Sequence, residues 1–467
     1  MNTELTPNFD PKNIVNSIRK AIDIGTTQST LASQGVDWES VVGVLDEAEH
    51  LIGKEMSVNS HLNSVMFTDE FNKQYEKTLP LISNFYSDLG ANKDLYKAFK
   101  RVNETTLNLQ QQHIVNDSLR SFELSGVALD GAKSERFKEI QEQLSVLSNQ
   151  FSKNVLQSTN SWKKTVSAEE LKGYGADEFS KVKTGDHYEI NLQVPVYIDL
   201  MTYADSSDLR EEVYKAYISR ASDIGITSKE FDNRPIMDEI LKLRLEMSEL
   251  VGFSNYADYS TQSKMVDSPD AVVDFLSTLI ELSTPQAKAE LSDLERFAGH
   301  ALMPWDLMYY SEKLKQKTFS FKRSDLKPYF PENSVFNGLF ETIQNLYDIK
   351  LTEIHEKTYH QDVRVIKLED KNGVIGRIYL DVYARENKRG GAWMSDYQGL
   401  YKDSLPVAFV VCNLSSPSDG KPALFDFDEI VTIFHEFGHA LHHLLTKVPF
   451  PCAAGISGVP WDGVELP

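Results

Sequence analysis

The sequence has very little cysteine: only Cys412 and Cys452 occur in 467 residues. Two thiols cannot build a disulfide framework for a chain of this length, so we interpret both as reduced residues in a reducing compartment. No stretch approaches the roughly 18 unbroken apolar residues that a membrane-spanning helix needs. The first residues, MNTELTPNFDPKNIVNS, lack the basic and apolar regions of a secretory signal. These absences predict a cytoplasmic protein without a membrane partner.

Basic residues are also scarce. Lys and Arg number 48 against 69 Asp and Glu, which gives a formal net charge of −21. Nucleic acids and anionic membranes both require basic surfaces, so this balance argues against either as the main partner. The charge favours solubility, and an acidic channel that attracts cationic peptides is a second interpretation.

Most of the sequence shows helical patterns. The chain is also long enough for two or more packed lobes. Between Phe137 and Val155 the apolar residues recur at steps of three and four, which predicts a long amphipathic helix. Pro235 indicates the first turn of another helix. Ser268-Pro269 and Thr284-Pro285 each combine a cap residue with a proline, so we predict two further helix starts there.

The pattern changes after about residue 360. Residues 362–369 and 374–384 predict a β-hairpin closed by the Asn-Gly pair at 372–373. Residues 406–414 predict a third strand, with a loop from Ala384 to Gln398 before it. That strand is a candidate edge for an extended peptide, although an ordinary core strand is the favoured interpretation. We place a boundary near 350, with a mainly helical region at 1–350 and a second region at 351–467.

The most informative segment is FDFDEIVTIFHEFGHALHHLL, residues 425–445. Its apolar residues follow a helical period, so His435 and His439, four residues apart, project from one face and can share a tetrahedral metal ion. Glu436 follows His435 and can reach water on the open side of that ion, where it serves as a general base. Four of the 11 histidines fall within 435–443, which makes chance clustering unattractive.

A third ligand has to come from elsewhere. His442 and His443 lie on the same helix, which cannot wrap three donors around one ion, so we interpret them as packing or supporting residues. The HExxHxxGxxH pattern of metzincins fails. A carboxylate from a following element completes the His₂Glu set of catalytic zinc, and Glu465 is the best donor. Asp462 is the alternative, although it also suits the cap of a following helix.

These residues resemble the thimet oligopeptidase family of zinc peptidases. The resemblance rests on HEFGHALHHLLT (435–446) and GISGVPWDGVELP (455–467), supported by LDVYARENKRGGAWM (380–394), KPALFDFDEIVTIF (421–434), PWDLMYYSEK (304–313) and SHLNSV (60–65). It implies a mainly α, two-lobed fold, with a small β-sheet before the zinc-binding helix and one Zn²⁺ per chain at the floor of a deep channel. It also implies cytoplasmic cleavage of short unstructured peptides, including spent signal peptides, and we predict a monomer.

By the same resemblance His435, His439 and Glu465 are the zinc ligands and Glu436 is the general base. Family members continue after the glutamate into a large helical portion, whereas this chain ends at Pro467. We therefore expect a C-terminally truncated form of the fold with an incomplete catalytic region and poor activity. The alternative is a non-catalytic product that at most binds zinc or peptide. A zinc aminopeptidase is disfavoured because no Gly-x-Met-Glu-Asn run precedes His435.

Overall fold

The computed structural model describes residues 6–9, 13–224, 229–320, 325–417, 420 and 422–466, and helices dominate these residues. Long amphipathic periods in the sequence become helices because each can bury one apolar stripe. The α-helices are α1 (Ile14–Ala32), α2 (Val44–Val65), α3 (Asp69–Gly90), α4 (Lys93–Asn103), α5 (Leu109–Leu124), α6 (Ala132–Ser161), α7 (Ala176–Val182), α8 (Val194–Tyr203), α9 (Ser207–Ile218), α10 (Arg234–Leu250), α11 (Tyr256–Thr261), α12 (Pro269–Ala298), α13 (Leu307–Phe319), α14 (Glu332–Tyr347) and α15 (Phe427–Leu444). The predicted mainly α fold with small sheets is confirmed.

The main sheet has five strands in the order β4-β5-β6-β8-β7. These strands are β4 (Lys350–Ile354), β5 (Arg364–Asp370), β6 (Gly373–Tyr383), β7 (Trp393–Gln398) and β8 (Val407–Leu414). The predicted hairpin is confirmed as β5 and β6. Its turn is closed by the Asp370 carboxylate, which accepts hydrogen bonds from the backbone N–H groups of Asn372 and Gly373 at 2.7 and 3.1 Å.

Two expectations were wrong, and one alternative is settled. The segment 384–398 is not all loop, because Trp393–Gln398 forms β7. The favoured interpretation of 406–414 as an ordinary core strand is confirmed, because β8 lies between β6 and β7, and β7 is the sheet edge on that side. Thr284-Pro285 does not begin a helix: Pro285 lies inside α12, and the Thr284 hydroxyl donates back to the Ile280 carbonyl at 2.6 Å. A second sheet of β1 (Lys163–Val166), β2 (Lys183–Thr184) and β3 (His187–Asn191) and the strand β4 were not predicted. The boundary near 350 stays a prediction.

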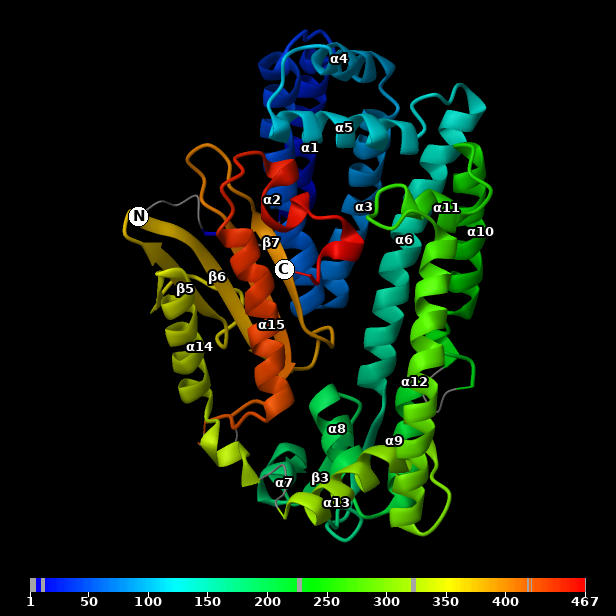
Figure 1. The fold of residues 1–467 in the computed structure, drawn as a ribbon, viewed down its shortest axis with the longest axis vertical. Helices are drawn as coiled ribbons and strands as arrows, with labels where there is room; N and C mark the ends of the chain where they lie inside the picture. Colours follow the sequence, from blue (N-terminus) through cyan, green and yellow to red (C-terminus); the bar gives the residue numbers. More distant parts are fainter. Residues whose placement is uncertain are drawn as a thin grey trace.

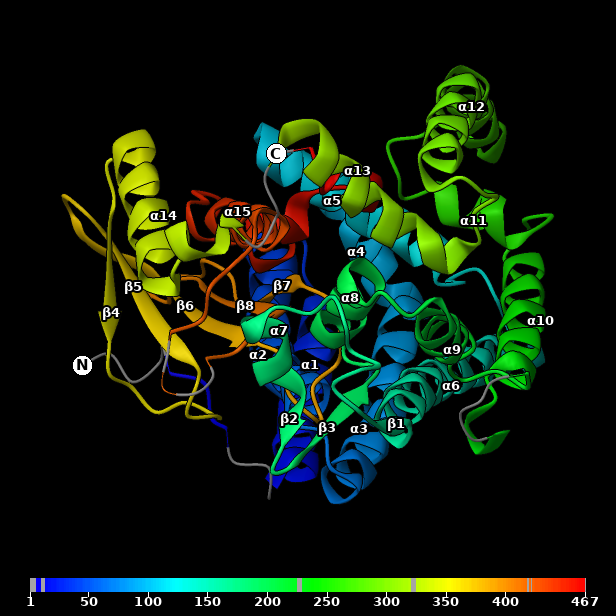
Figure 2. The same cartoon turned by 90° about the horizontal axis from the view of Figure 1, so that it is seen from below.

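Helices cover both faces of the main sheet, as Figure 2 shows. Side chains alternate along a strand, so neighbouring residues face opposite layers. Ile378, Leu380, Ala408 and Val410 pack in one core with α14 and α15. The residues that alternate with them, Tyr379, Val407 and Phe409, pack in another core with Ile14 of α1 and Val58 and Leu62 of α2. The sheet is therefore a fixed base on which α15 lies.

The helices α6, α10 and α12 stand on the side of the molecule away from the sheet (Figure 1). Helices α6 and α10 share a small core of Phe137, Ile140, Leu243 and Met247. Helix α12 is different, because Leu294 is its only buried residue among those described. In the part of the chain that the structure describes, no helix combines the length and the apolar character needed to cross a membrane.

Candidate metal centre

Helix α15 begins at a well-defined cap. The Asp426 carboxylate accepts from the Glu429 N–H at 3.0 Å, and the Glu429 carboxylate accepts from the Asp426 N–H at 2.9 Å. This reciprocal pair satisfies two backbone donors that a helix start leaves free. Ile433, Phe437 and other apolar residues of α15 are buried against the sheet. Burial of that stripe turns His435 and His439 away from the core.

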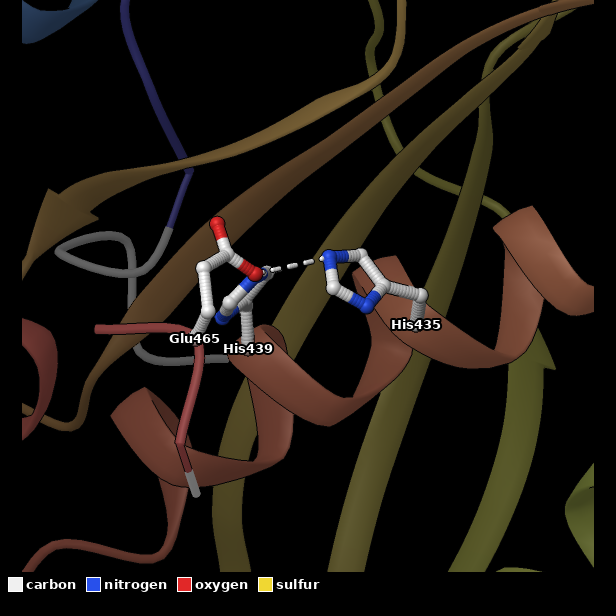
Figure 3. A group of neighbouring side chains, drawn as sticks. All are labelled: His435, His439 and Glu465. Atoms are coloured by element: carbon white, nitrogen blue, oxygen red, sulfur yellow. Dashed lines mark hydrogen bonds and ion pairs between the residues drawn. The ribbon is translucent and has the colours of Figure 1, made fainter. Parts of the chain in front are cut away.

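Glu465 meets these two histidines. Its Oε2 atom lies 3.1 Å from His435 Nε2 and 3.2 Å from His439 Nε2, and the two Nε2 atoms are 3.1 Å apart. Figure 3 shows both rings and the carboxylate converging on one point from α15 and from the chain that follows it. The side chains differ in exposure, at 49% for His435, 14% for His439 and 67% for Glu465.

The spacing of these three atoms fits a divalent metal. A tetrahedral zinc ion with ligand bonds of about 2.0–2.1 Å holds neighbouring ligand atoms about 3.3 Å apart, close to the separations seen here. Two neutral imidazole nitrogens and one carboxylate oxygen are also the donor types of catalytic zinc sites. The three residues form one of the two groups of potential ligands in the described part of the chain. The residues present therefore fit a zinc ion.

Glu436 lies beside this group in a dry environment. It is 6% exposed. Burial raises the pKa of its carboxyl to about 7; the charge of Glu465 also raises it, while His435 and a backbone hydrogen bond from Met394 of β7 lower it. Cys412, in β8, is fully buried nearby, and burial followed by the Glu436 charge raises the pKa of its thiol to about 12.

The connecting segment, residues 446–464, carries the chain from α15 to Glu465. Phe450 packs edge-on against Trp38, with ring centroids 5.2 Å apart. The Asp462 carboxylate accepts from the backbone N–H groups of Met265 and Val266 at 2.9 and 3.0 Å. Asp462 is therefore engaged with the chain before α12, and it is Glu465 that the structure brings to the two histidines.

The other two histidines of α15 lie apart from the ligand group. His443 is fully buried, and its Nε2 donates to the Gln398 carbonyl of β7 at 2.9 Å. His442 is partly buried and lines a cavity of about 530 Å³ on the side of the connecting segment. Strand β7 thus contacts both His443 and Glu436, a relation that the sequence analysis missed because it treated 393–398 as loop.

Comparison with known proteins gives consistent matches. Residues 200–467 match Peptidase family M3, and residues 18–134 match the N-terminal domain of neurolysin and thimet oligopeptidase. Oligopeptidase A of Escherichia coli (strain K12) is 43% identical over 98% of this chain and 71% of that relative. Oligopeptidase A of Haemophilus influenzae is 40% identical over the same shares. Among solved structures, PZ peptidase A with an inhibitor has a similar fold, with a TM-score of 0.56 and 12% identity over 99% of this chain and 68% of that one.

Proposed function

We propose that this chain, which belongs to peptidase family M3 and has oligopeptidases among its relatives, is a zinc-dependent endopeptidase. Its proposed substrates are short unstructured peptides in the cytoplasm, cleaved signal peptides among them. The observation that carries the proposal is the approach of His435 Nε2, His439 Nε2 and Glu465 Oε2 to within 3.1–3.2 Å of one another. These three residues are the proposed ligands of one ion.

When bound, Zn²⁺ supplies a Lewis acid that polarises a peptide carbonyl and makes water more acidic. Glu436 is the proposed general base. One of its carboxylate oxygens takes a proton from water and passes it to the nitrogen of the leaving amine. Its position next to His435 on α15, with β7 behind it, keeps the carboxylate near the ligand group and shielded from bulk solvent.

The edge of β7 is the proposed docking site for the peptide backbone. Among the described residues β7 pairs with no strand other than β8. Its Asp396 and Gln398 carbonyls already accept hydrogen bonds from the Ser57 hydroxyl and from His443, so an extended peptide would pair with the backbone groups that remain. Met394 on this strand is hydrogen-bonded to Glu436 through its backbone, so a peptide added to β7 runs past the proposed base. Folded substrates are excluded because strand addition requires an extended chain.

Metal analysis of purified variants tests the ligand set. His439→Ala and Glu465→Ala should bind one zinc ion fewer per chain, whereas His442→Ala, one turn away on the same helix, should bind as much zinc as the unsubstituted protein. Cleavage of a short unstructured peptide should follow zinc content and stop when a chelator is added. Undiminished zinc in His439→Ala would overturn the ligand set. Bound zinc without any peptide cleavage would favour a binding role over a catalytic one.

A further inference from the structure

A second group of potential ligands is separate from the His435–His439–Glu465 group. We propose that Asp46, Glu49 and Cys452 bind a thiophilic divalent cation such as Zn²⁺, which fastens the connecting segment to α2. One carboxylate oxygen of each acid and the Cys452 Sγ lie within 4.8 Å of one another. Asp46 and Glu49 are three residues apart on α2 and share one face, while Cys452 lies in the short helical turn Pro451–Ala453 that packs on α2.

Asp46 gives the reason to expect a cation. It is 5% exposed, and none of the described residues donates a hydrogen bond to its carboxylate. Burial, reinforced by the charges of Glu49 and Glu39, raises the pKa of this carboxyl to about 7. An ionised carboxylate in such a place is costly unless it is paired or bound to a metal. Its oxygen lies near Glu49 and Cys452, so a cation at that point would compensate it.

The charges around the group have the sign that a cation needs. Cys452 is an exposed residue. The protein atoms packed around its sulfur raise the pKa of the thiol, and the negative charges of Glu49, Asp46 and Asp117 raise it further. Two basic residues face the group. Lys402 lowers the pKa of Asp46 and forms an ion pair with Glu47 at 3.8 Å, and Lys54 lines a cavity together with Glu49 and Cys452. A bound divalent ion would neutralise these acids and displace the thiol proton.

The group is also accessible. Glu49 and Cys452 both line two cavities, of about 450 and 280 Å³. An ion can enter from either cavity, and water can complete its coordination. One thiolate with two carboxylates favours Zn²⁺ or Co²⁺ over Mg²⁺ and Ca²⁺, which prefer oxygen ligands alone.

The position of the Asp46–Glu49–Cys452 group, between α2 and the connecting segment, suggests what a bound ion would do. Cys452 is on the connecting segment, between the contact of Phe450 with Trp38 and the contact of Asp462 with Met265 and Val266. An ion shared with α2 would add a third attachment to this segment before it reaches Glu465. The second ion would thereby restrict where the proposed third ligand of the first site can lie.

Cobalt binding tests the second site separately from the first. The His435–His439–Glu465 group contains no sulfur, so absorption from sulfur-to-cobalt charge transfer reports the second site alone. Metal-free protein kept reduced under nitrogen should develop this absorption when Co²⁺ is added. Cys452→Ser should abolish it and bind one ion fewer per chain. Cys412→Ser, the matched control with the other free thiol, should keep the absorption.

Three further variants complete the experiment. A His435→Ala/His439→Ala protein should keep the sulfur-to-cobalt absorption even if the proposed peptidase site is lost. Asp46→Asn should weaken Co²⁺ binding by more than roughly 10–100-fold. A loss of roughly that size is typical when the residue removed only hydrogen-bonds to a metal ligand. In the double-histidine protein, Zn²⁺ should slow amide hydrogen exchange in residues 450–458, and Cys452→Ser should remove that effect. Absence of the absorption from the unsubstituted chain, or its persistence in Cys452→Ser, would overturn the proposal.

Discussion

Helices α12 and α15 both carry an apolar stripe, yet they are held in opposite ways. Helix α15 buries Ile433, Phe437, Ala440, Leu441 and Leu444 against the sheet. Over its 30 residues, α12 buries Leu294 alone. The large apolar residues that α12 exposes, by 37–72% of their surface, are Val272, Val273, Phe275, Leu276, Leu279, Ile280, Leu282 and Leu291.

This difference shows that an apolar helix face and the burial of that face are two separate properties, although one sequence pattern is used to predict both. Periodicity determines which face of a helix is apolar, but only contacts with other elements decide whether that face is covered. Helix α15 has a sheet beneath it, so its polar side chains are held in fixed directions. In α12 the charged side chains are all at least partly exposed. The exposed apolar face of α12 is typical of an interaction surface.

The largest contrast should come from the same substitution on each helix. Glu436→Gln on α15 should lower peptidase turnover by about 10²–10⁴-fold while zinc stays bound, because glutamine keeps the shape but cannot accept the proton. Glu281→Gln on exposed α12 should leave turnover unchanged. Steady-state kinetics with a short peptide, together with metal analysis, checks both. Near-normal turnover in zinc-loaded Glu436→Gln would reject this residue as the base.

Phenylalanine truncation compares the two apolar faces directly. Phe437→Ala should lower the free energy of unfolding by about 3–5 kcal/mol, because it opens a cavity beneath α15. Phe275 on α12 is 63% exposed, so Phe275→Ala should change stability by less than about 0.5 kcal/mol and should reduce self-association. Urea unfolding measures the first effect and light scattering the second. Equal losses of stability would contradict the contrast between the helices.

A buried histidine should make the sheet side sensitive to acid. His61 of α2 is 4% exposed and stacks on Phe409 with ring centroids 3.8 Å apart. Burial is the largest cause that lowers the pKa of His61 to about 3. The unfolded chain therefore binds a proton at higher pH than the folded protein, and stability is lost as pH falls from about 6.5 towards 3.

Between about pH 7 and pH 5 this linkage amounts to about 2 kcal/mol of unfolding free energy. His61→Phe keeps the aromatic stack and removes the titrating group, so the variant should lose less stability over that interval than the unsubstituted protein. Urea midpoints at the two pH values measure the difference. Identical pH dependence in the two proteins would mean that His61 is not the source.

The smallest effect should be the same for both helices. The Asp426 carboxylate caps α15, and the Ser268 hydroxyl caps α12 by accepting from the Ala271 N–H at 3.2 Å. Asp426→Ala and Ser268→Ala should each cost about 1 kcal/mol, because a cap acts within the first turn and does not depend on what covers the helix. Thermal unfolding of the two variants checks this, and a clearly unequal loss would show that tertiary cover also affects the caps.

Local patterns predicted much of this fold. Steps of three and four defined α15, and alternation around Asn372-Gly373 defined the hairpin. Strand β7 was missed because WMSDYQ alternates poorly and follows a Gly-Gly pair, so it is a strand only by pairing with β8. Pro285 resembles a helix start, but α12 continues through it at an exposed position where the lost hydrogen bond faces solvent.

In the candidate site, too, local spacing predicted some residues, whereas contacts between distant residues could not be predicted. His435, Glu436 and His439 could be chosen from spacing, because a helix fixes their relation. Glu465 was chosen by its chemistry, while the contacts that bring it near come from distant residues: Phe450 on Trp38, and Asp462 on Met265 and Val266. No local pattern in residues 446–464 specifies those partners.

The same contacts set an order of assembly. Helix α15 can form within microseconds from its own residues, and its two histidines become neighbours as soon as it does. Glu465 reaches them only after the chain has closed loops as long as the one between Met265 and Asp462, which are 197 positions apart in the sequence. Contacts of such sequence separation form late in folding. A metal ion that meets the nascent protein should therefore find a two-histidine intermediate first, and only a folded chain should hold it firmly.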